Sequence, residues 1–522
     1  MSAKRNKTTS ALSAVPEVLA VIDIGSNAIR MVIAQALPDG KLEILERLWR
    51  AVRLGQDTFR TGRLRAETMR SAISILRDYR SLLNTYGAGR IRAVATTALR
   101  EAENGDVFVD RIGMATGLDV SIINAAEEGR LTVSAVRQAV GDNLLSQGDA
   151  LVVEVGGGST ATNLLHDGQI AASQSMPIGS IRMQETLSTG AGTPAQAVRL
   201  IRKQVAGAIS TFKGILPLGK AQTFVAVGGD ARWAATQVGR SIGSTGLFTV
   251  SKEALDGLIS ACQGSTADKL ARTYNLSFTD AETIVPALLV HQALLKATGA
   301  REMIVTAVSM RDGILQDMIT GSAGRHTDSY KEVIQSAQAV GGKYCTDMAH
   351  AEHTRMLAAR LFDELAGEHR LGERHRLLLE VAAILHEVGV FVSSRAHHKH
   401  SYYLISNSEI LGLTQDELVM VAHIARYHRR SRPKPAHVEY MSMARERRMI
   451  VSKLAAILRI ADALDVSRTQ QIREISCRIG ADGLTISVQG NPDLIMEQRA
   501  LAEKGDMLAD IYGLDVHVEA TG

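Results

Sequence analysis

Val21-Ile22-Asp23-Ile24-Gly25-Ser26-Asn27 places an apolar run with one carboxylate directly before a turn that contains glycine. A second stretch, Val152-Val153-Glu154-Val155-Gly156-Gly157-Gly158-Ser159-Thr160, repeats this order. In both, β-branched residues predict a strand and glycine predicts a tight turn after it. The backbone N–H groups of such a turn can bind a phosphate, and the carboxylate can hold a divalent cation facing it. The pair predicts an internal duplication around a shared cleft; the alternative is two buried strands with ordinary hairpin turns.

The overall composition is typical of a globular protein with about three or four domains. The 522 residues are 45% hydrophobic and 22% charged, and the net charge is +4. No apolar run reaches the roughly 18 residues of a membrane span. Residues 1–15 are polar and basic without an apolar core, so we expect a disordered tail and not a secretory signal. Three widely spaced cysteines argue against a disulfide framework or a zinc site and favour a reducing cytoplasm.

Strands and helices are predicted in the same order twice. The first series begins with strands at 18–23, 29–37 and 42–48, followed by a loop at 53–64 and a helix at 66–83. A strand at 91–95, a helix at 107–115, a strand at 120–123 and a helix to about 140 complete it. The second series also begins with three strands: 150–155, 161–166, 169–175, helix 194–212, strand 223–227, helices 252–261 and 280–296, strand 303–305 and helix 312–319.

The composition changes after residue 320. Residues 321–327 are small and polar and predict a linker. From 328 to about 467 helical periodicity replaces the strand patterns, and most of the histidines lie here. Residues 472–522 predict a small α+β unit: a first strand, a second strand at 484–488, a helix at 493–503 and a third strand at 515–519.

Several of these segments together resemble one protein family. They are Asp23-Ile24-Gly25-Ser26-Asn27, Ala95-Thr96-Thr97-Ala98-Leu99-Arg100-Glu101-Ala102, Glu127-Glu128-Gly129-Arg130-Leu131, Val155-Gly156-Gly157-Gly158-Ser159-Thr160, Ala226-Val227-Gly228-Gly229 and, further on, Ile384-Leu385-His386-Glu387-Val388-Gly389 with His398-Lys399-His400-Ser401. Over about residues 18–466 the chain resembles the exopolyphosphatase and guanosine pentaphosphate phosphatase family, in its longer form.

The resemblance implies an α/β fold with two duplicated halves of the actin/hexokinase/Hsp70-like (ribonuclease H-like) kind. These halves would occupy residues 16–140 and 141–322. An all-α HD-like domain would follow at 323–468 and a small α+β domain at 469–522.

The resemblance also assigns roles around a phosphoanhydride substrate. Glu128 would be the catalytic base; from the residues alone, Glu127 and Glu128 could instead merely cap a helix. Asp23 and Glu154 would hold Mg²⁺, largely through waters. The phosphates would be bound by Gly25, Ser26, Asn27, Thr96, Arg100, Gly156, Gly157, Gly158, Ser159, Thr160, Gly228 and Gly229. Arg100 suits a bidentate phosphate contact, although a surface ion pair is the simpler reading.

The chain departs from the family pattern at four places. Glu154 stands where aspartate is usual, Ala161 replaces a glutamate, and Asp230 replaces a small or hydroxyl residue after the glycine pair. The fourth is the block from Thr306 to Gly313. Together these departures put the mode of metal binding, and the catalytic rate, in question.

Basic and histidine-rich segments form a second functional feature. They are His397–His400, Arg426–Lys434 and Arg445–Arg448. A track of cations binds a flexible polyanion by counterion release, although it can also be a solvated charged face. The residues that we expect to bind a polymer are His398, Lys399, His400, Arg429 and Arg430. Aromatic residues make up only 4%, which argues against base stacking and for an inorganic chain.

The helical part also resembles HD-type phosphohydrolase domains. His353, His386 and Asp462 fall where those domains have metal ligands, but the usual His-Asp doublet is His386-Glu387 here. A longer carboxylate changes a close-packed metal site, so packing or substrate binding is the favoured reading of this region.

Three functional hypotheses follow. The first is an exopolyphosphatase that releases terminal orthophosphate with Mg²⁺ and functions as a cytoplasmic homodimer without a membrane span or a specific nucleic-acid partner. The second is a guanosine pentaphosphate 5′-phosphohydrolase. The third, of another class, is a regulatory protein that binds polyphosphate or an alarmone with little turnover.

Overall fold

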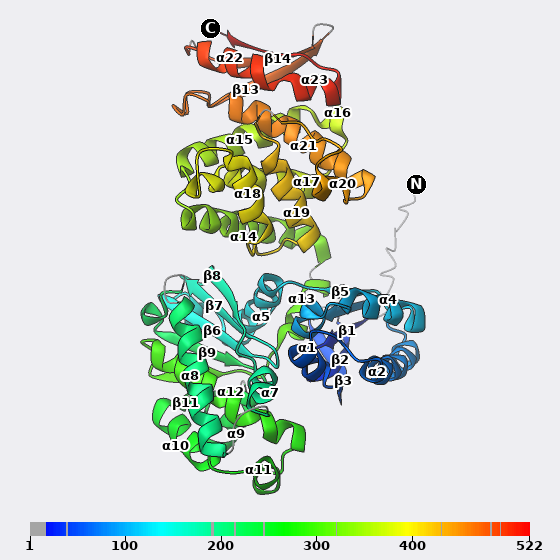
Figure 1. The fold of residues 1–522 in the computed structure, drawn as a ribbon, viewed down its shortest axis with the longest axis vertical. Helices are drawn as coiled ribbons and strands as arrows, with labels where there is room; N and C mark the ends of the chain where they lie inside the picture. Colours follow the sequence, from blue (N-terminus) through cyan, green and yellow to red (C-terminus); the bar gives the residue numbers. More distant parts are fainter. Residues whose placement is uncertain are drawn as a thin grey trace, which may run out of the picture. The chain divides into compact units, whose positions relative to one another are not determined.

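The computed structural model describes residues 17–37, 40–188, 193–212, 216–243, 246–319, 321–429, 431–480, 483–490 and 492–521. The predicted tail at 1–15 therefore lies outside the described residues. The chain divides into two compact units, which are considered separately (Figure 1). The first ends at Gly324 and the second begins at Arg325, except that Ile170–Ala172 group with the second.

The first half of the first unit is built on a mixed sheet with strand order β3-β2-β1-β4-β5 (blue in Figure 1). The strands are β1 (Val18–Ile24), β2 (Ala28–Ala36), β3 (Leu42–Ala51), β4 (Arg90–Ala95) and β5 (Val120–Ile122). β1 pairs antiparallel with β2 and parallel with β4. The helices are α1 (Leu54–Thr61), α2 (Ala66–Thr85), α3 (Thr97–Glu101), α4 (Gly105–Thr116), α5 (Ala125–Val140) and α6 (Asp142–Leu145).

β1, in the centre of the first sheet, is buried on both faces, which explains its nearly continuous apolar run. Ala20, Ile22 and Ile24 share one apolar cluster with residues of α2 and α4. Leu19 and Val21 face the other way and pack with residues of α13 (Met310–Ile319), which returns to this half from far along the chain.

The loop predicted at 53–64 is wrong, because α1 forms there. The helix ends at Gly62, whose φ of 75° is in the left-handed region that favours glycine. Its buried face includes Asp57 and Thr58, which are satisfied by hydrogen bonds: the Thr58 hydroxyl donates to the Ala98 carbonyl, and Asp57 accepts from Arg65. A buried face made partly of polar residues gives no apolar period to detect.

The second half repeats the design around a larger sheet with strand order β10-β11-β12-β9-β6-β7-β8. The strands are β6 (Asp149–Val155), β7 (Thr160–His166), β8 (Gln169–Met176), β9 (Thr223–Val227), β10 (Arg240–Ile242), β11 (Leu247–Ser251) and β12 (Glu302–Val305). The helices, besides α13, are α7 (Ser180–Ser188), α8 (Pro194–Phe212), η1 (Leu218–Lys220), α9 (Gly229–Val238), α10 (Lys252–Cys262), α11 (Ala267–Tyr274) and α12 (Phe278–Ala297).

The predicted duplication is confirmed by the strand registers. Asp23 on β1 pairs with Arg30 on β2, and Glu154 on β6 pairs with Ala161 on β7. Each hairpin closes with the same turn: the Gly25 N–H donates to the Ala28 carbonyl at 3.1 Å, and the Gly156 N–H donates to the Ser159 carbonyl at 2.9 Å. β9 then lies parallel to β6 as β4 lies parallel to β1.

The second unit is mainly helical and carries a small sheet with strand order β13-β14-β15. Its helices are α14 (Gly321–Lys343), α15 (Met348–Glu364), α16 (Ala366–His369), α17 (Glu373–Leu385), η2 (Val388–Phe391), α18 (His397–Ser406), α19 (Gln415–Arg426), α20 (Val438–Met441), α21 (Arg445–Ala463), α22 (Ile495–Lys504) and α23 (Asp506–Tyr512). Its strands are β13 (Ile475–Gly480), β14 (Gly483–Gln489) and β15 (Val516–Thr521).

Two features of this unit differ from the sequence reading. The linker predicted at 321–327 is the start of α14, because a polar stretch without proline is compatible with a helix. The small sheet also shares its core with the helices: Leu484, Ile486 and Val488 belong to the same apolar cluster as the residues of α17 and α21. Among the described residues, no helix has the length and hydropathy to cross a membrane.

A close crossing of α13 and α5 in the first unit gives a test of this packing. A Cβ at Gly313 would lie 2.1 Å from the Leu131 carbonyl oxygen, a backbone atom that cannot move aside. We expect Gly313→Ala to lower the free energy of unfolding by about 1–3 kcal/mol. Gly207→Ala on α8, where nothing lies within 4 Å of the added Cβ, should instead raise it by about 0.5–1 kcal/mol. Thermal and chemical denaturation measure both, and a neutral Gly313→Ala variant would contradict the crossing.

Candidate active site

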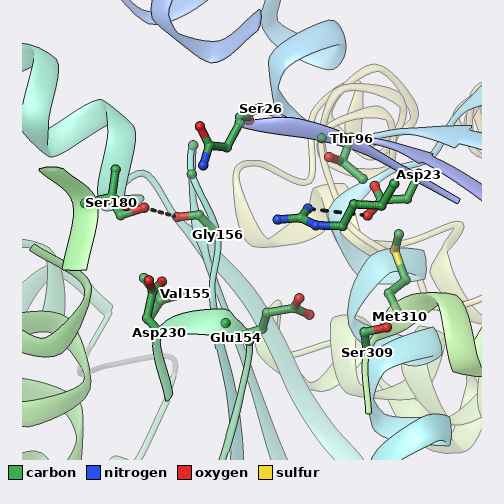
Figure 2. A pocket seen from close by; sticks show the side chains of 18 of the residues that line it. Asp23, Ser26, Thr96, Glu154, Val155, Gly156, Ser180, Asp230, Ser309 and Met310 are labelled. Carbon is green, nitrogen blue, oxygen red and sulfur yellow. Dashed lines mark hydrogen bonds and ion pairs between the residues drawn. The ribbon is translucent and has the colours of Figure 1, made fainter. Parts of the chain in front are cut away.

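A single cavity of about 380 Å³ in the first unit is lined by residues of both halves (Figure 2). Asp23, Ser26 and Thr96 of the first half lie across it from Glu154, Gly156 and Asp230 of the second half. The predicted site residues that line it are Asp23, Gly25, Ser26, Asn27, Thr96, Glu128, Glu154, Gly156, Gly157, Gly158, Ser159, Gly228 and Gly229.

The two hairpin turns offer unpaired backbone donors to this cavity. The carbonyls of Ser26 and Asn27 accept hydrogen bonds from the N–H groups of Gly55 and Val52, at 2.8 and 3.0 Å. Their own N–H groups have no hydrogen-bond partner among the described residues. The same holds for the N–H groups of Gly157 and Gly158. Unpaired N–H groups in facing turns are suited to bind phosphate oxygens.

The turn after β6 needs glycine because it packs closely against both halves. A Cβ at Gly158 would lie 2.3 Å from Cζ of Phe59 and 2.8 Å from Cγ2 of Thr97. The Gly156 and Gly157 carbonyls accept from the N–H groups of Ser180 and Ile181 at the start of α7, each at 2.9 Å. Because α7 binds the carbonyls of this turn, the N–H groups of Gly157 and Gly158 remain available to a ligand in the cavity.

A third donor group is the N-terminus of α9. Gly228 precedes this helix with a φ of 117°, a conformation that strongly favours glycine, and Gly229 begins it. Both glycines line the cavity. The free N–H groups and the positive end of the helix dipole at this position favour an anion.

Direct contacts hold the two halves together around the cavity. The hydroxyls of Thr97 and Ser159 share a hydrogen bond at 3.0 Å. Arg311, from the start of α13, donates to Asp23 at 2.7 Å. Arg182 on α7 forms an ion pair with Glu101 at 2.6 Å. The two sequence stretches therefore face one cavity, and the alternative of unrelated hairpin turns is wrong.

The structure separates the roles of Glu127 and Glu128. Glu127 accepts two hydrogen bonds from Arg130, at 2.8 and 2.9 Å, and Arg130 also donates to Asp317 at 2.6 Å. The N-cap of α5 is Asn124, whose side chain accepts from the Glu127 N–H at 2.8 Å. Glu128 lines the cavity, and among the residues that the structure describes only Arg100 forms an ion pair with its carboxylate, at 3.5 Å. Glu128 is thus not needed as a cap and is positioned to act in the cavity.

Two carboxyl groups of the cavity titrate near neutral pH. Burial raises the pKa of Glu128 to about 7; the guanidinium of Arg100 opposes this shift, and the carboxylates of Glu154 and Asp23 reinforce it. Burial likewise raises the pKa of Asp230 to about 7, with a further contribution from Asp280. A carboxylate with a pKa near 7 is an effective general base at neutral pH.

Asp23 and Glu154 have the chemistry of a magnesium site. Burial and the nearby Asp23 raise the pKa of Glu154, whose carboxylate accepts from the Thr132 hydroxyl at 2.9 Å. A divalent cation would relieve this repulsion, and oxygen ligands with bound waters suit Mg²⁺. Arg311 already contacts one oxygen of Asp23. Ala161, directly across the strand pair from Glu154, offers no ligand.

Two predicted phosphate ligands do not line the cavity. Arg100 donates to the Ile123 carbonyl at 2.7 Å and to the Thr97 hydroxyl at 3.0 Å, besides its contact with Glu128. It lies behind the base, where it can orient the carboxylate. Thr160 is fully buried and donates to the Ile178 carbonyl at 2.9 Å. The guanidinium of Arg100 is therefore engaged within the protein, and its bidentate phosphate contact stays a prediction.

The residues that line the cavity and that sequence reasoning did not assign to the site include three arginines and two tryptophans. They are Arg30, Arg232, Arg311, Trp49 and Trp233. Arg30 could have been found, because it stands directly opposite Asp23 in the predicted hairpin. No local signal points to the others. Arg232 has no hydrogen bond or ion pair among the described residues, and burial together with Arg311 lowers its pKa.

The predicted polymer-binding residues lie in the second unit. Lys399 is exposed, and Arg429 and His400 are half-buried. Burial and the neighbouring Arg429 lower the pKa of His398 to about 4, so this side chain is neutral at pH 7. Arg430 lies outside the described residues.

Comparison with known proteins identifies the family. A model of the Ppx/GppA phosphatase family matches residues 32–321, and a model of domain III of the same family matches residues 334–505. The chain belongs to the Ppx/GppA phosphatase family. It is accordingly a hydrolase of the phosphoanhydride class.

Two relatives of this Ppx/GppA protein are named guanosine-5′-triphosphate,3′-diphosphate pyrophosphatase. The protein from Vibrio parahaemolyticus is 24% identical over 489 residues, which cover 90% of this chain and 91% of the relative. The protein from Aeromonas hydrophila is 24% identical over 484 residues, which cover 90% of this chain and 92% of the relative.

Two solved structures show the same fold. An exopolyphosphatase from Cytophaga hutchinsonii has a TM-score of 0.54 and 21% identity, and the match covers 58% of this chain and 98% of that one. An exopolyphosphatase-like protein has a TM-score of 0.50 and 25% identity, with the same two coverages. The duplicated α/β fold predicted for the Ppx/GppA part is confirmed, and a helical region with a small sheet follows it.

Proposed function

We propose that the protein removes the terminal 5′ phosphate of guanosine pentaphosphate. The observation that carries this choice is the position of its two tryptophans. Trp49 on β3 and Trp233 on α9 both line the cavity that contains Glu128. Indole faces stack on nucleobases, and this stabilises binding by about 1–3 kcal/mol per base. The two relatives named guanosine-5′-triphosphate,3′-diphosphate pyrophosphatase give independent support.

This proposal replaces the first hypothesis from the sequence, which favoured an inorganic chain. That hypothesis used the low aromatic content of the whole chain. Content says nothing about position, and Trp233 is held in place by an edge-to-face contact with Tyr274 at 5.2 Å. Few aromatic residues are sufficient when both tryptophans lie at one cavity.

The proposed reaction uses the residues already described. The unpaired N–H groups of the two turns and of α9 bind the phosphate oxygens, and Arg232 supplies an uncommitted positive charge. Glu128 accepts a proton from water, whose oxygen attacks the terminal phosphorus as the bond to the bridging oxygen breaks. Orthophosphate and guanosine tetraphosphate leave. Mg²⁺ held by Asp23 and Glu154 would neutralise charge on the phosphates.

Inorganic polyphosphate is the second candidate substrate. The likeness to an exopolyphosphatase-like protein at 25% identity favours it. So does the positive charge of Lys399 and Arg429, which lie close enough to His398 to lower its pKa. Both substrates present a terminal phosphate to the same cavity, so the chemistry at Glu128 is shared.

The role of Glu128 as the general base can be tested by substitution. Glu128→Gln removes the proton acceptor and should lower the turnover number by about 10²–10⁴-fold with little change in substrate affinity. Glu127→Gln is the matched control, because its carboxylate is engaged with Arg130 outside the cavity and turnover should change only a few-fold. Phosphate release with Mg²⁺ measures both. Tight binding by the wild-type protein without phosphate release would support a regulatory protein instead.

The second prediction concerns pH. Glu128 acts in its deprotonated form, so the rate at limiting substrate should rise about tenfold per pH unit below its pKa of about 7 and level off above it. Arg100→Gln removes the charge that lowers this pKa, so the rising limb should move to higher pH. Asp230→Asn should not change the pH at which the rate rises. If this pH shifts in the Asp230→Asn variant, the titrating group is Asp230 and not Glu128.

The third prediction separates the substrates. Trp49→Ala should raise the KM for guanosine pentaphosphate by about 5–150-fold, the equivalent of one lost stacking contact. Hydrolysis of polyphosphate should be unaffected, and Trp49→Phe should retain most of the nucleotide affinity. Steady-state kinetics on both substrates measure this. Equal effects on the two substrates, or a strong wild-type preference for polyphosphate, would overturn the nucleotide assignment.

A further inference from the structure

One side chain of the first half, that of Arg53, reaches across to a helix of the second half. Arg53 lies at the N-cap of α1, and its guanidinium forms an ion pair with Glu282 on α12 at 2.9 Å. The same nitrogen donates to the Thr279 hydroxyl at 3.3 Å. In the part of the chain that the structure describes, the hydrogen bonds and the ion pair that join α12 to the first half all come from this guanidinium.

The backbone on either side of Arg53 supports the turn that follows β1. The Val52 N–H donates to the Asn27 carbonyl at 3.0 Å, and the Gly55 N–H donates to the Ser26 carbonyl at 2.8 Å. The packing is close here, since a Cβ at Gly55 would lie 2.8 Å from Cβ of Ser26. A displacement of Arg53 is therefore passed on to the turn whose N–H groups face the cavity.

The other end of the contact also lies beside the cavity. Glu282 belongs to the start of α12, and Asp280 and Thr283 of the same stretch line the cavity. Arg53 therefore joins the turn after β1 to a part of α12 that forms the cavity wall.

The other polar contacts described between the halves involve different elements. Thr97 of α3 shares a hydrogen bond with Ser159, and Arg182 of α7 forms an ion pair with Glu101. These contacts hold α7 and the turn after β6, but they do not include α12. Loss of the Arg53 guanidinium would leave α12 without a polar link to the first half among the described residues.

An ion pair at this level of exposure can also be a simple surface contact. The Arg53 side chain is 38% exposed and that of Glu282 is 23% exposed. Such pairs contribute little to overall stability, because solvent screens them. Arg63 and Glu103 form a comparable pair at 2.8 Å, but both belong to the first half. The Arg53 contact differs from it by its place between the cavity wall and the turn.

We propose that Arg53 is a positioning residue that holds the cavity in the closed form that binds a terminal phosphate. Through Glu282 and Thr279 it sets the distance between the turn after β1 and the second half. Donors in two halves bind one phosphate chain together only when they are held at the matching distance. The inference rests on the proposed function in one respect, that the cavity binds a terminal phosphate, and it applies to both candidate substrates.

A weaker link lowers the fraction of free molecules in the closed form. The apparent affinity falls in proportion to this fraction, whereas the saturated complex is closed and turns over normally. Loss of the link should therefore raise KM and leave kcat nearly unchanged. Loss of a catalytic group would lower kcat instead.

Steady-state kinetics of phosphate release test this role. Arg53→Gln and Glu282→Gln should each raise KM by about 2–30-fold on whichever of the two substrates the wild type hydrolyses. The double variant should be no worse than Arg53→Gln, because both changes remove the same link. The exchanged pair, Arg53→Glu with Glu282→Arg, should recover most of the affinity. Arg63→Gln is the matched control and should keep the wild-type KM.

A second measurement needs no turnover. The chain has two tryptophans, Trp49 in the first half and Trp233 in the second, and both line the cavity. Acrylamide should quench their fluorescence more strongly in Arg53→Gln than in the wild type, because an open cavity exposes both rings. Inorganic tripolyphosphate with Mg²⁺ should reduce this difference by closing the cavity.

The proposal is overturned if folded Arg53→Gln and Glu282→Gln keep the wild-type KM and the wild-type quenching and lose only thermal stability. A wild-type protein that releases phosphate from neither substrate would refute the proposed function instead. The comparison of quenching without ligand would then still decide whether Arg53 holds the cavity closed.

Discussion

The first unit depends on backbone donors that the protein itself does not satisfy. Ser26, Asn27, Gly157 and Gly158 present N–H groups to one cavity without a partner among the described residues. The glycines, the capture of the turn carbonyls by α7, and the contact between Thr97 and Ser159 all preserve this arrangement. The phosphate oxygens of the proposed substrate are acceptors, which complement these donors.

The sequence predicted this part well because its signals are local. Alternating β-branched residues marked β1 and β6, and glycine marked the turns that follow them. The register of the two hairpins then follows from the turns themselves. β10 and β11 were missed, since β10 has only three residues, all exposed, and makes no period-2 pattern that could be recognised. The start of α14 was missed because small polar residues fit both a linker and a helix.

The site was only partly predictable for a different reason. Neighbouring glutamates look alike in sequence, and only the position of Arg130 and Asp317, which is 187 residues distant, separates Glu127 from Glu128. Arg100 contacts Glu128 but does not line the cavity, because its side chain turns back to the Ile123 carbonyl. The contribution of Trp49 and Trp233 depends on tertiary structure, which brings β3 and α9 to the same cavity. Composition could not show this.

A pair of buried histidines in the second unit illustrates a limit of reasoning by position along a helix. His350 and His353 lie one turn apart on α15, and both are buried. Only the partner on Nδ1 distinguishes them: Asp465 orients His350 toward Asp462. Such supporting contacts come from residues more than a hundred positions away and leave no local trace in the sequence.

The contact between Lys504 and Asp462 has a consequence for how the chain matures. Lys504 comes from α22, near the end of the polypeptide, and the strands around it share one apolar core with the helices. During synthesis the helical part is therefore exposed for a time with an unfinished interior and an uncompensated carboxylate. α22 must therefore be synthesised and packed before Asp462 gains the ammonium group of Lys504 as its partner.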